Sequence, residues 1–119
     1  MSIDREARFR TGVEAAIERD DPVELEDLAL RVALEGQERE WIQACCAQLA
    51  RHRSAVVRGN AVAALGHVAR RFGRLDPHRV KRIVEIALFD RSDYVRRQAA
   101  SAADDLATFL SWEFEREAR

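Results

Sequence analysis

The sequence predicts an all-α protein, a short α-solenoid of about six helices in three antiparallel pairs. The composition is helical and globular, since 119 residues contain two prolines and five glycines, with 47% apolar and 34% charged residues. Apolar residues recur at the spacing of amphipathic helices. Residues 57–65 and 95–103 also match each other at a constant offset of 38 residues. A period of this size is typical of stacked helix pairs.

The leading pair is predicted over residues 1–36 and would cap the array. A helix over 3–19 is followed by Asp20-Asp21-Pro22, where an acidic cap and a proline begin the next helix. That helix is expected to run from Pro22 to Leu34 and to close at Gly36. The apolar positions of the first helix are Ile3, Ala7, Val13, Ala16 and Ile17.

The second pair is predicted over 38–74 and the third over 76–112. Helices over 38–51 and 55–72 are joined by a short turn, with Ser54 as N-cap and Gly73 as the end of the second helix. Asp76-Pro77 repeats the acid–proline start. The expected core of the 38–51 helix is Trp41, Ile42, Cys45 and Leu49. The chain is thus expected to form one domain over 1–119, with a charged tail over 113–119 that frays.

The last helix, predicted over 93–112, has three faces. Its buried stripe is predicted to be Val95, Ala99, Ala102, Leu106, Phe109 and Leu110. The opposite face carries Arg97 and Asp104 and should be solvated. Between them runs a flank of Tyr94, Gln98, Ser101, Asp105, Thr108 and Trp112.

Charge is segregated along the chain although the net charge is −1. Residues 1–40 carry a net charge of −6, residues 41–83 of +8 and residues 84–119 of −3. Solvated helix faces explain this pattern, and a basic middle segment could also touch nucleic acid.

No catalytic, cofactor or metal site is predicted. Cys45 and Cys46 are adjacent, so on a helix they diverge and cannot share a metal or form an ordinary disulfide. The three histidines do not pair with other ligands at metal-binding spacing. We expect a protein that is not an enzyme, because the sequence places no plausible nucleophile beside a base. We also expect it to be cytoplasmic, because no run suits a secretory signal or a membrane span.

Two strings, VVRGNAVAALGHVARRFG and DRSDYVRRQAASAADDLATFL, resemble HEAT repeats. The bacterial form opens its second helix with D-x-x-x-V-R-x-x-A-A-x-A-L. Val95, Arg96, Ala99, Ala100 and Ala103 stand at its positions, with alanine where leucine is usual, and Asp90 supplies the acid one residue before its place in the pattern. His52 replaces that acid in the earlier copy. The resemblance implies a right-handed solenoid and leaves the pairing of the earlier arginine open.

A narrower resemblance is to small HEAT-like immunity proteins of polymorphic or contact-dependent toxin systems. It rests on residues 57–70, Leu75-Asp76, Val80 and residues 102–110. It implies a non-catalytic inhibitor that occludes a cognate toxin domain, such as a basic nuclease, as one monomer of a heterodimeric complex.

The contact face for such a partner is predicted on the flank of the last helix and its counterpart 38 residues earlier. Aromatic side chains beside carboxylates are typical of protein interfaces. The predicted partner-binding residues are Asp90, Asp93, Tyr94, Gln98, Asp104, Asp105, Trp112, Asn60 and His67. Tyr94 and Trp112 could instead cover the open end of the core. Asp104→Arg with Asp105→Arg is expected to weaken binding and leave the fold intact.

Two alternatives stay open. A nucleic-acid binder would use the arginine-rich middle on phosphates. Its candidate residues are Arg51, Arg53, Arg58, Arg70, Arg71 and Arg74. A general HEAT-type adaptor is the second alternative.

Overall fold

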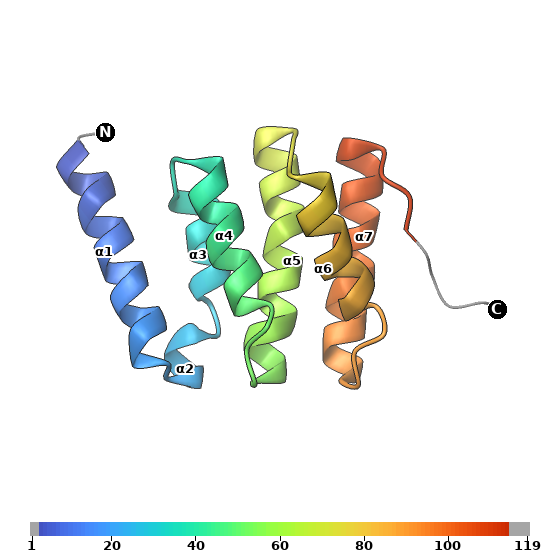
Figure 1. Ribbon diagram of the computed structural model, residues 1–119, viewed down its shortest axis with the longest axis horizontal. Helices are drawn as coiled ribbons and strands as arrows, with labels where there is room; N and C mark the ends of the chain where they lie inside the picture. The colour runs from blue at the N-terminus through green and yellow to red at the C-terminus, as the bar shows by residue number, and fades with distance from the viewer. Residues whose placement is uncertain (1–2, 115–119) are drawn as a thin grey trace.

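The computed structural model describes residues 3–114, and every regular element in that range is a helix. The predicted all-α class is therefore confirmed. The helices are α1 (Ile3–Arg19), α2 (Pro22–Leu25), α3 (Leu28–Glu35), α4 (Arg39–Leu49), α5 (Ala55–Phe72), α6 (Pro77–Ala87) and α7 (Asp93–Leu110), as Figure 1 shows. Of the predicted frayed tail, residues 115–119 lie outside the described range.

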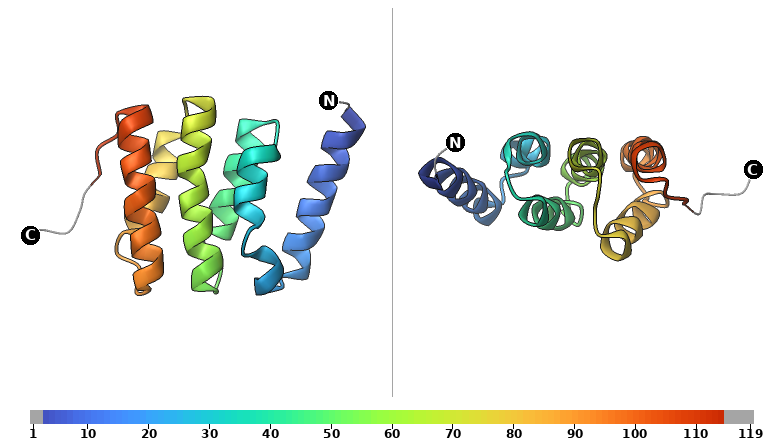
Figure 2. Two further views of the ribbon diagram at one scale, coloured as in Figure 1. Left: turned by 180° about the vertical axis from the view of Figure 1, so that it is seen from behind. Right: turned by 90° about the horizontal axis from the view of Figure 1, so that it is seen from above.

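The helices lie in two rows. Seen from above, α3, α5 and α7 form one row, and α4 and α6 form the other (Figure 2). Helix α1 stands at one end of the molecule and α7 at the other (Figure 1). The molecule is elongated, with extents of 50 × 29 × 18 Å. Each end therefore presents a helix with a neighbour on one side only.

The predicted start signals form helix caps. Asp21 accepts a hydrogen bond from the Val23 amide at 3.0 Å, and Asp76 accepts one from the His78 amide at 3.1 Å. Each cap satisfies an amide that has no partner in the first helical turn. The hydroxyls of Ser54 and Ser92 cap α5 and α7 in the same way.

The second predicted helix, Pro22 to Leu34, is divided into α2 and α3 by two turn residues. Helix α2 ends at Leu25, and the freed carbonyl of Glu26 accepts a hydrogen bond from Asn60 Nδ2 at 2.8 Å. A continuous helix would use that carbonyl for its own backbone. A side chain of α5, 34 residues away in the sequence, thus satisfies the carbonyl that the division leaves free.

One cluster of buried side chains runs from Val13 in α1 to Leu106 in α7. The predicted stripe on α7 is confirmed at Val95, Ala99, Ala102 and Leu106, all of which are fully buried. The prediction is wrong for Phe109, which is 42% exposed.

The Phe109 ring lies against an arginine of α5. The guanidinium carbon of Arg70 lies 5.3 Å from the ring centroid, which is a cation–π distance. Phe109 belongs to the last turn of α7, where its side chain is partly open to solvent. A helical projection alone does not show where along a helix the buried stripe ends.

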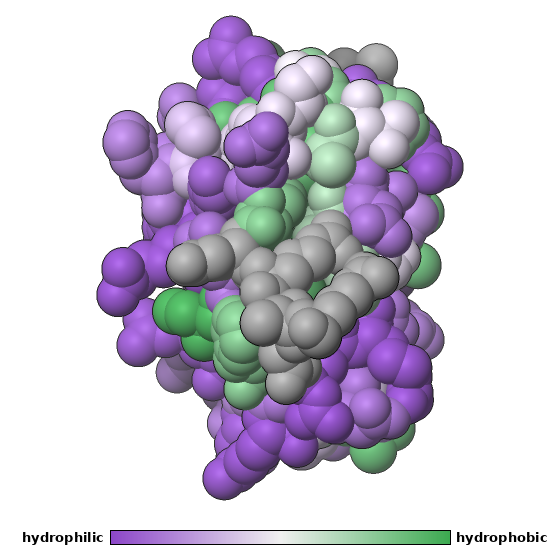
Figure 3. Space-filling model, turned by 90° about the vertical axis from the view of Figure 1, so that its right-hand side faces the viewer, coloured by the Kyte–Doolittle hydropathy of each residue, from purple (hydrophilic) through white to green (hydrophobic). Residues whose placement is uncertain are grey.

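The chain leaves α7 two residues earlier than predicted. Ser111 adopts φ 59°, a left-handed conformation that ends the helix. Trp112 then packs against the core, half-buried, with the Phe114 ring centroid 6.3 Å from its own. Figure 3 looks onto this end, where several patches of hydrophobic surface are visible among hydrophilic surface. Trp112 therefore serves to cover the end of the core.

Helix α1 contacts α4 through few side chains. Val13 and Ala16 are buried, but Ile3 and Ala7 at its start are exposed. Trp41, predicted to be buried, is half-buried. Its ring lies edge-on to Phe9 at 5.9 Å, and the Arg10 guanidinium lies 4.8 Å from the ring centroid. Trp41 thus joins the leading helix to the rest of the chain.

Candidate functional site

The turns at one end of the helices are joined by charged side chains. Arg58 on α5 donates two hydrogen bonds to the Asp90 carboxylate, at 2.8 and 2.9 Å. Each of these two side chains is only 14% exposed. Arg58 also donates to the carbonyl of His52 at 3.0 Å. Asp90 is thus engaged within the chain and is not presented to a partner.

The sequence left open which acid pairs with Arg58, because His52 stands where the repeat pattern has an acid. Arg58 forms its ion pair with Asp90, 32 residues later in the turn before α7, and donates to a backbone carbonyl of its own turn. His52 in turn donates from Nε2 to Asp20 at 2.6 Å, because its Nδ1 accepts from the Ser54 amide. Asp20 also accepts from Arg53. Side chains therefore link the turn before α2, the turn before α5 and the turn before α7.

Both acids in these links have a lowered pKa. The Arg58 guanidinium holds the pKa of Asp90 below its usual value, and the hydrogen bond from Arg53, followed by that from His52, lowers the pKa of Asp20. A carboxyl group whose pKa is lower in the folded state stabilises that state above its unfolded pKa, about 3.9. This contribution is lost as the pH falls through the folded pKa.

Acidification is expected to reduce the free energy of unfolding less steeply in Asp90→Asn than in the wild-type protein. The wild type must protonate a paired carboxylate on acidification, whereas the amide has no charge to lose. Urea unfolding followed by circular dichroism, between about pH 6 and about pH 3, measures both slopes. Asp20 is present in both proteins, so its protonation contributes equally to the two slopes. Equal slopes would contradict a stabilising role of the Asp90 charge.

Tyr94, predicted to contact a partner, lies in the interface between α7 and α5. Its hydroxyl donates to Asn60 Oδ1, and Asn60 donates to the Glu26 carbonyl. Its ring lies over Gly59, where a Cβ would come within 2.9 Å of two ring carbons. Tyr94 and Asn60 therefore join α7, α5 and the turn between α2 and α3, and leave little side chain for a partner.

Alanine at Gly59 is expected to lower the free energy of unfolding by about 1–2 kcal/mol, because the clash with Tyr94 outweighs the helix propensity gained. Alanine at Gly12 is the matched control. It lies in the interior of α1, and its Cβ would meet no atom within 4 Å. It should raise the free energy of unfolding by up to about 1 kcal/mol. Chemical denaturation of both variants checks the opposite signs, and stabilisation by Gly59→Ala would exclude the close approach.

Asp105 also lies against α5. A Cβ at Gly66 would come within 2.5 Å of Asp105 Oδ2, and Arg70 Nη2 is 3.9 Å from its carboxylate. Because the Asp105 side chain lies this close to the α5 backbone, an arginine at position 105 would be crowded there, and loss of binding in the Asp104→Arg/Asp105→Arg variant would not isolate a partner contact. Asp104 is exposed, and Asp104→Arg alone is the cleaner probe.

The other predicted contact residues do not gather into one site. Asp93 is exposed and pairs with Arg96 and Arg97 on its own helix. Gln98 and His67 are half-buried, and the Gln98 side chain approaches Gly59 on α5. Gln98, Tyr94 and Asp105 thus belong to a packed helix interface more than to an open surface.

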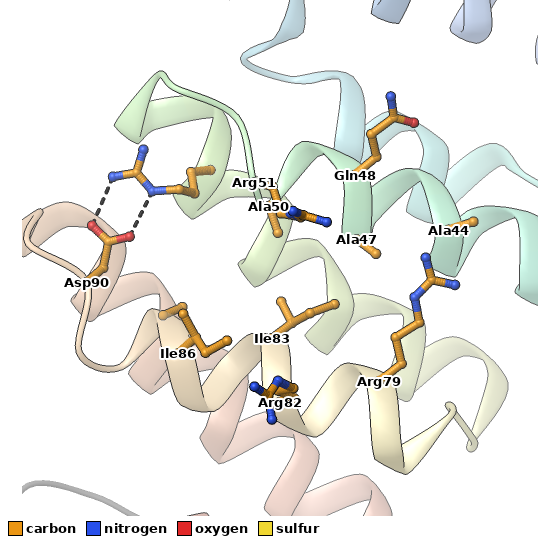
Figure 4. A pocket seen from close by; sticks show the side chains of 12 residues that line it. Ala44, Ala47, Gln48, Ala50, Arg51, Arg79, Arg82, Ile83, Ile86 and Asp90 are labelled. Carbon is orange, nitrogen blue, oxygen red and sulfur yellow. Dashed lines mark hydrogen bonds and ion pairs between the residues drawn. The ribbon is translucent and has the colours of Figure 1, made fainter.

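A groove lies on the other row of helices, between α4 and α6 (Figure 4). Its volume is about 950 Å³. The apolar residues that line it are Ala44, Ala47, Ala50, Ile83, Ile86 and Ala87. Arg79 stands at one end beside Ala44, and the pair of Arg58 and Asp90 closes the other (Figure 4).

Three of the arginines that line the groove form no ion pair with another described residue. Within residues 3–114, the guanidinium groups of Arg51, Arg79 and Arg82 have no ion pair, hydrogen bond or ring contact. The one carboxylate in the lining, Asp90, is already paired with Arg58. The groove is therefore apolar along its floor and positive along its sides.

The sequence reasoning did not select Arg79, Arg82 or Ile86 for a site. The signal was present as the net charge of +8 over residues 41–83 and as the exposure of Ile86, which is 63%. Periodicity places Ile86 on the edge of a helix, but it does not show that α4 and α6 leave a groove between them. The separation of α4 from α6 depends on how the helices pack in three dimensions.

The two cysteines are buried, as expected for core side chains. Burial raises the pKa of Cys45 to about 11 and that of Cys46 to about 12. Among the described residues, no group of three or more His, Cys, Asp or Glu side chains is placed to hold a metal ion. None of the described helices is both long and apolar enough to cross a membrane.

Comparisons with protein families, with curated proteins and with solved structures gave no match to this chain.

Proposed function

We propose that this chain is a short HEAT-like α-solenoid that acts as a non-catalytic, protein-binding inhibitor of the immunity type. The 38-residue repeat and the two rows of helices support the solenoid (Figure 2). The observation that carries the binding function is the groove between α4 and α6, which combines an apolar floor with three unpaired arginines. Apolar contacts framed by charge are typical of protein recognition sites.

Protein is favoured over nucleic acid as the partner because of how the arginines are used. Of the six arginines in the nucleic-acid hypothesis, four are held by contacts within the chain. These contacts are Arg53 with Asp20, Arg58 with Asp90, Arg70 with Phe109 and Arg71 with Phe72. Among the described residues that line the groove, none has an aromatic ring on which a base could stack.

The experiment is affinity purification from the source cells followed by reconstitution. A co-purifying protein is identified by mass spectrometry, produced separately and assayed for its own activity with increasing amounts of this chain. The proposal expects that activity to fall to background at about one chain per partner. Denatured chain at the same concentration is the control.

Other results would overturn the proposal in distinct ways. A partner that binds stoichiometrically and keeps its activity would identify an adaptor. RNA or DNA that co-purifies and is released by moderate salt would identify a nucleic-acid binder. Asp104→Arg separates the surfaces, since the inhibitor should tolerate it if the groove and not the α7 face makes the contact.

A further inference from the structure

The groove between α4 and α6 has a shape that a helix can fill. Helix α5 packs closely against both α7 and α3, whereas α4 and α6 touch little. The lining from Arg79 to Ile86 covers two turns of α6, or about 10 Å at 1.5 Å per residue. Ile83 and Ile86 present apolar surface on consecutive turns. Solvent-exposed apolar surface of this kind is stabilised when a complementary apolar face covers it.

The positive charge around the apolar floor favours a bound molecule that carries negative charge. Arg79 and Arg82 are one turn apart on α6, and Arg51 extends from the end of α4. None of the three has a partner among the described residues. Arginine forms strong, directional hydrogen bonds with carboxylates. An occupant with carboxylates one turn apart beside an apolar stripe would satisfy both the sides and the floor of the groove.

We propose that the groove binds an acidic amphipathic helix of the protein partner, with its apolar face on Ile83 and Ile86 and its carboxylates at Arg51, Arg79 and Arg82. This inference rests on the proposed protein-binding function and specifies the chemistry of the partner. It differs from the sequence-based expectation, in which acids of this chain face a basic partner. A phosphate backbone would meet the arginines but leave Ile83 and Ile86 uncovered, so a peptide fits the groove better than a nucleic acid does.

The test uses the full chain and three synthetic peptides as probes. Each peptide is an alanine-based helix with a leucine stripe, flanked by glutamates in the first, by glutamines in the second and by lysines in the third. Fluorescence anisotropy measures the affinities, and amide chemical shifts locate the site. We expect the glutamate peptide to bind about tenfold more tightly than the glutamine peptide. The shifts should fall on α4 and α6.

Two matched variants test the assignment. Arg82→Glu should weaken binding of the glutamate peptide by about tenfold, because it replaces an attractive charge with a repulsive one. Arg8→Glu makes the same change on exposed α1, far from the groove, and should leave the affinity within about twofold. Both positions are on the surface, so thermal melts should confirm that both variants fold. Ile86→Ser should weaken the glutamate and glutamine peptides equally.

Several outcomes would overturn the proposal. Equal affinity for the three peptides would remove the role of charge, and shifts confined to α3, α5 and α7 would place the site elsewhere. A single-stranded RNA that binds more tightly than the glutamate peptide and is lost in Arg82→Glu would make the groove a nucleic-acid site. A concentration-dependent dimer abolished by Arg82→Glu would make a second copy of the chain the occupant.

The failure of this inference can be distinguished from failure of the proposed function. If Arg82→Glu still inhibits the purified partner fully, the partner uses another surface and the inhibitor function stands. If the wild-type chain inhibits no co-purified protein, the inhibitor function fails whatever the peptides do.

Discussion

Replacing Leu106 with alanine is expected to lower the free energy of unfolding by about 2–5 kcal/mol. Leu106 is fully buried on α7, the last helix of its row. The truncation removes apolar contacts and leaves a cavity that the surrounding helices fill only partly. Urea denaturation monitored by circular dichroism measures the change.

Phe109→Ala is the matched control for this prediction. Phe109 lies three residues further on the same helix but is 42% exposed, with one face against Arg70. Its removal should lower the free energy of unfolding by only about 1 kcal/mol. If Phe109→Ala were the more damaging change, the orientation of α7 about its own axis would differ from the one described.

Replacing Arg58 with alanine is expected to lower the free energy of unfolding by about 2–4 kcal/mol. The change removes both hydrogen bonds to Asp90 and the bond to the His52 carbonyl. The Asp90 carboxylate would remain, mostly buried, with only the Ser92 amide among these partners. A charge left in such a site is destabilising beyond the loss of the attraction itself.

A double-mutant cycle checks the Arg58 prediction. Arg58→Ala and Asp90→Ala should together lower the free energy of unfolding by less than the sum of the single changes, with a coupling of more than about 1 kcal/mol. Arg97→Ala is the control, since Arg97 pairs with Asp93 on the exposed surface and should contribute less than about 1 kcal/mol. Additive effects of Arg58→Ala and Asp90→Ala would contradict a direct pair.

The helices and their starts were predictable because their causes are local. Pro22 and Pro77 each follow an acid that caps the helix, and Gly73 ends α5 with φ 70°, where a residue with a side chain would be strained. These signals act within four or five residues. The first helix and the extent of α5 were predicted with the bounds that the structure shows.

The role of the flank on α7 was harder to predict. A mixture of Tyr94, Gln98 and Asp105 at helical spacing is equally consistent with an outer surface and with a polar helix interface. The structure distinguishes them because Gly59 and Gly66 on α5 let these side chains approach the backbone. Glycines at positions 59 and 66, two helical turns apart on α5, were the available sequence signal.

By itself, the sequence determined the helical class, most helix ends and the buried stripe of α7 as far as Leu106. Hydrogen-bonding caps and the 3.6-residue period act between residues close in the chain, so they can be read without a structure. The tertiary structure alone decided the pairing of Arg58 with Asp90, the division between α2 and α3, and the groove with its free arginines. Each joins residues more than 30 positions apart, and their distances depend on how the helices pack.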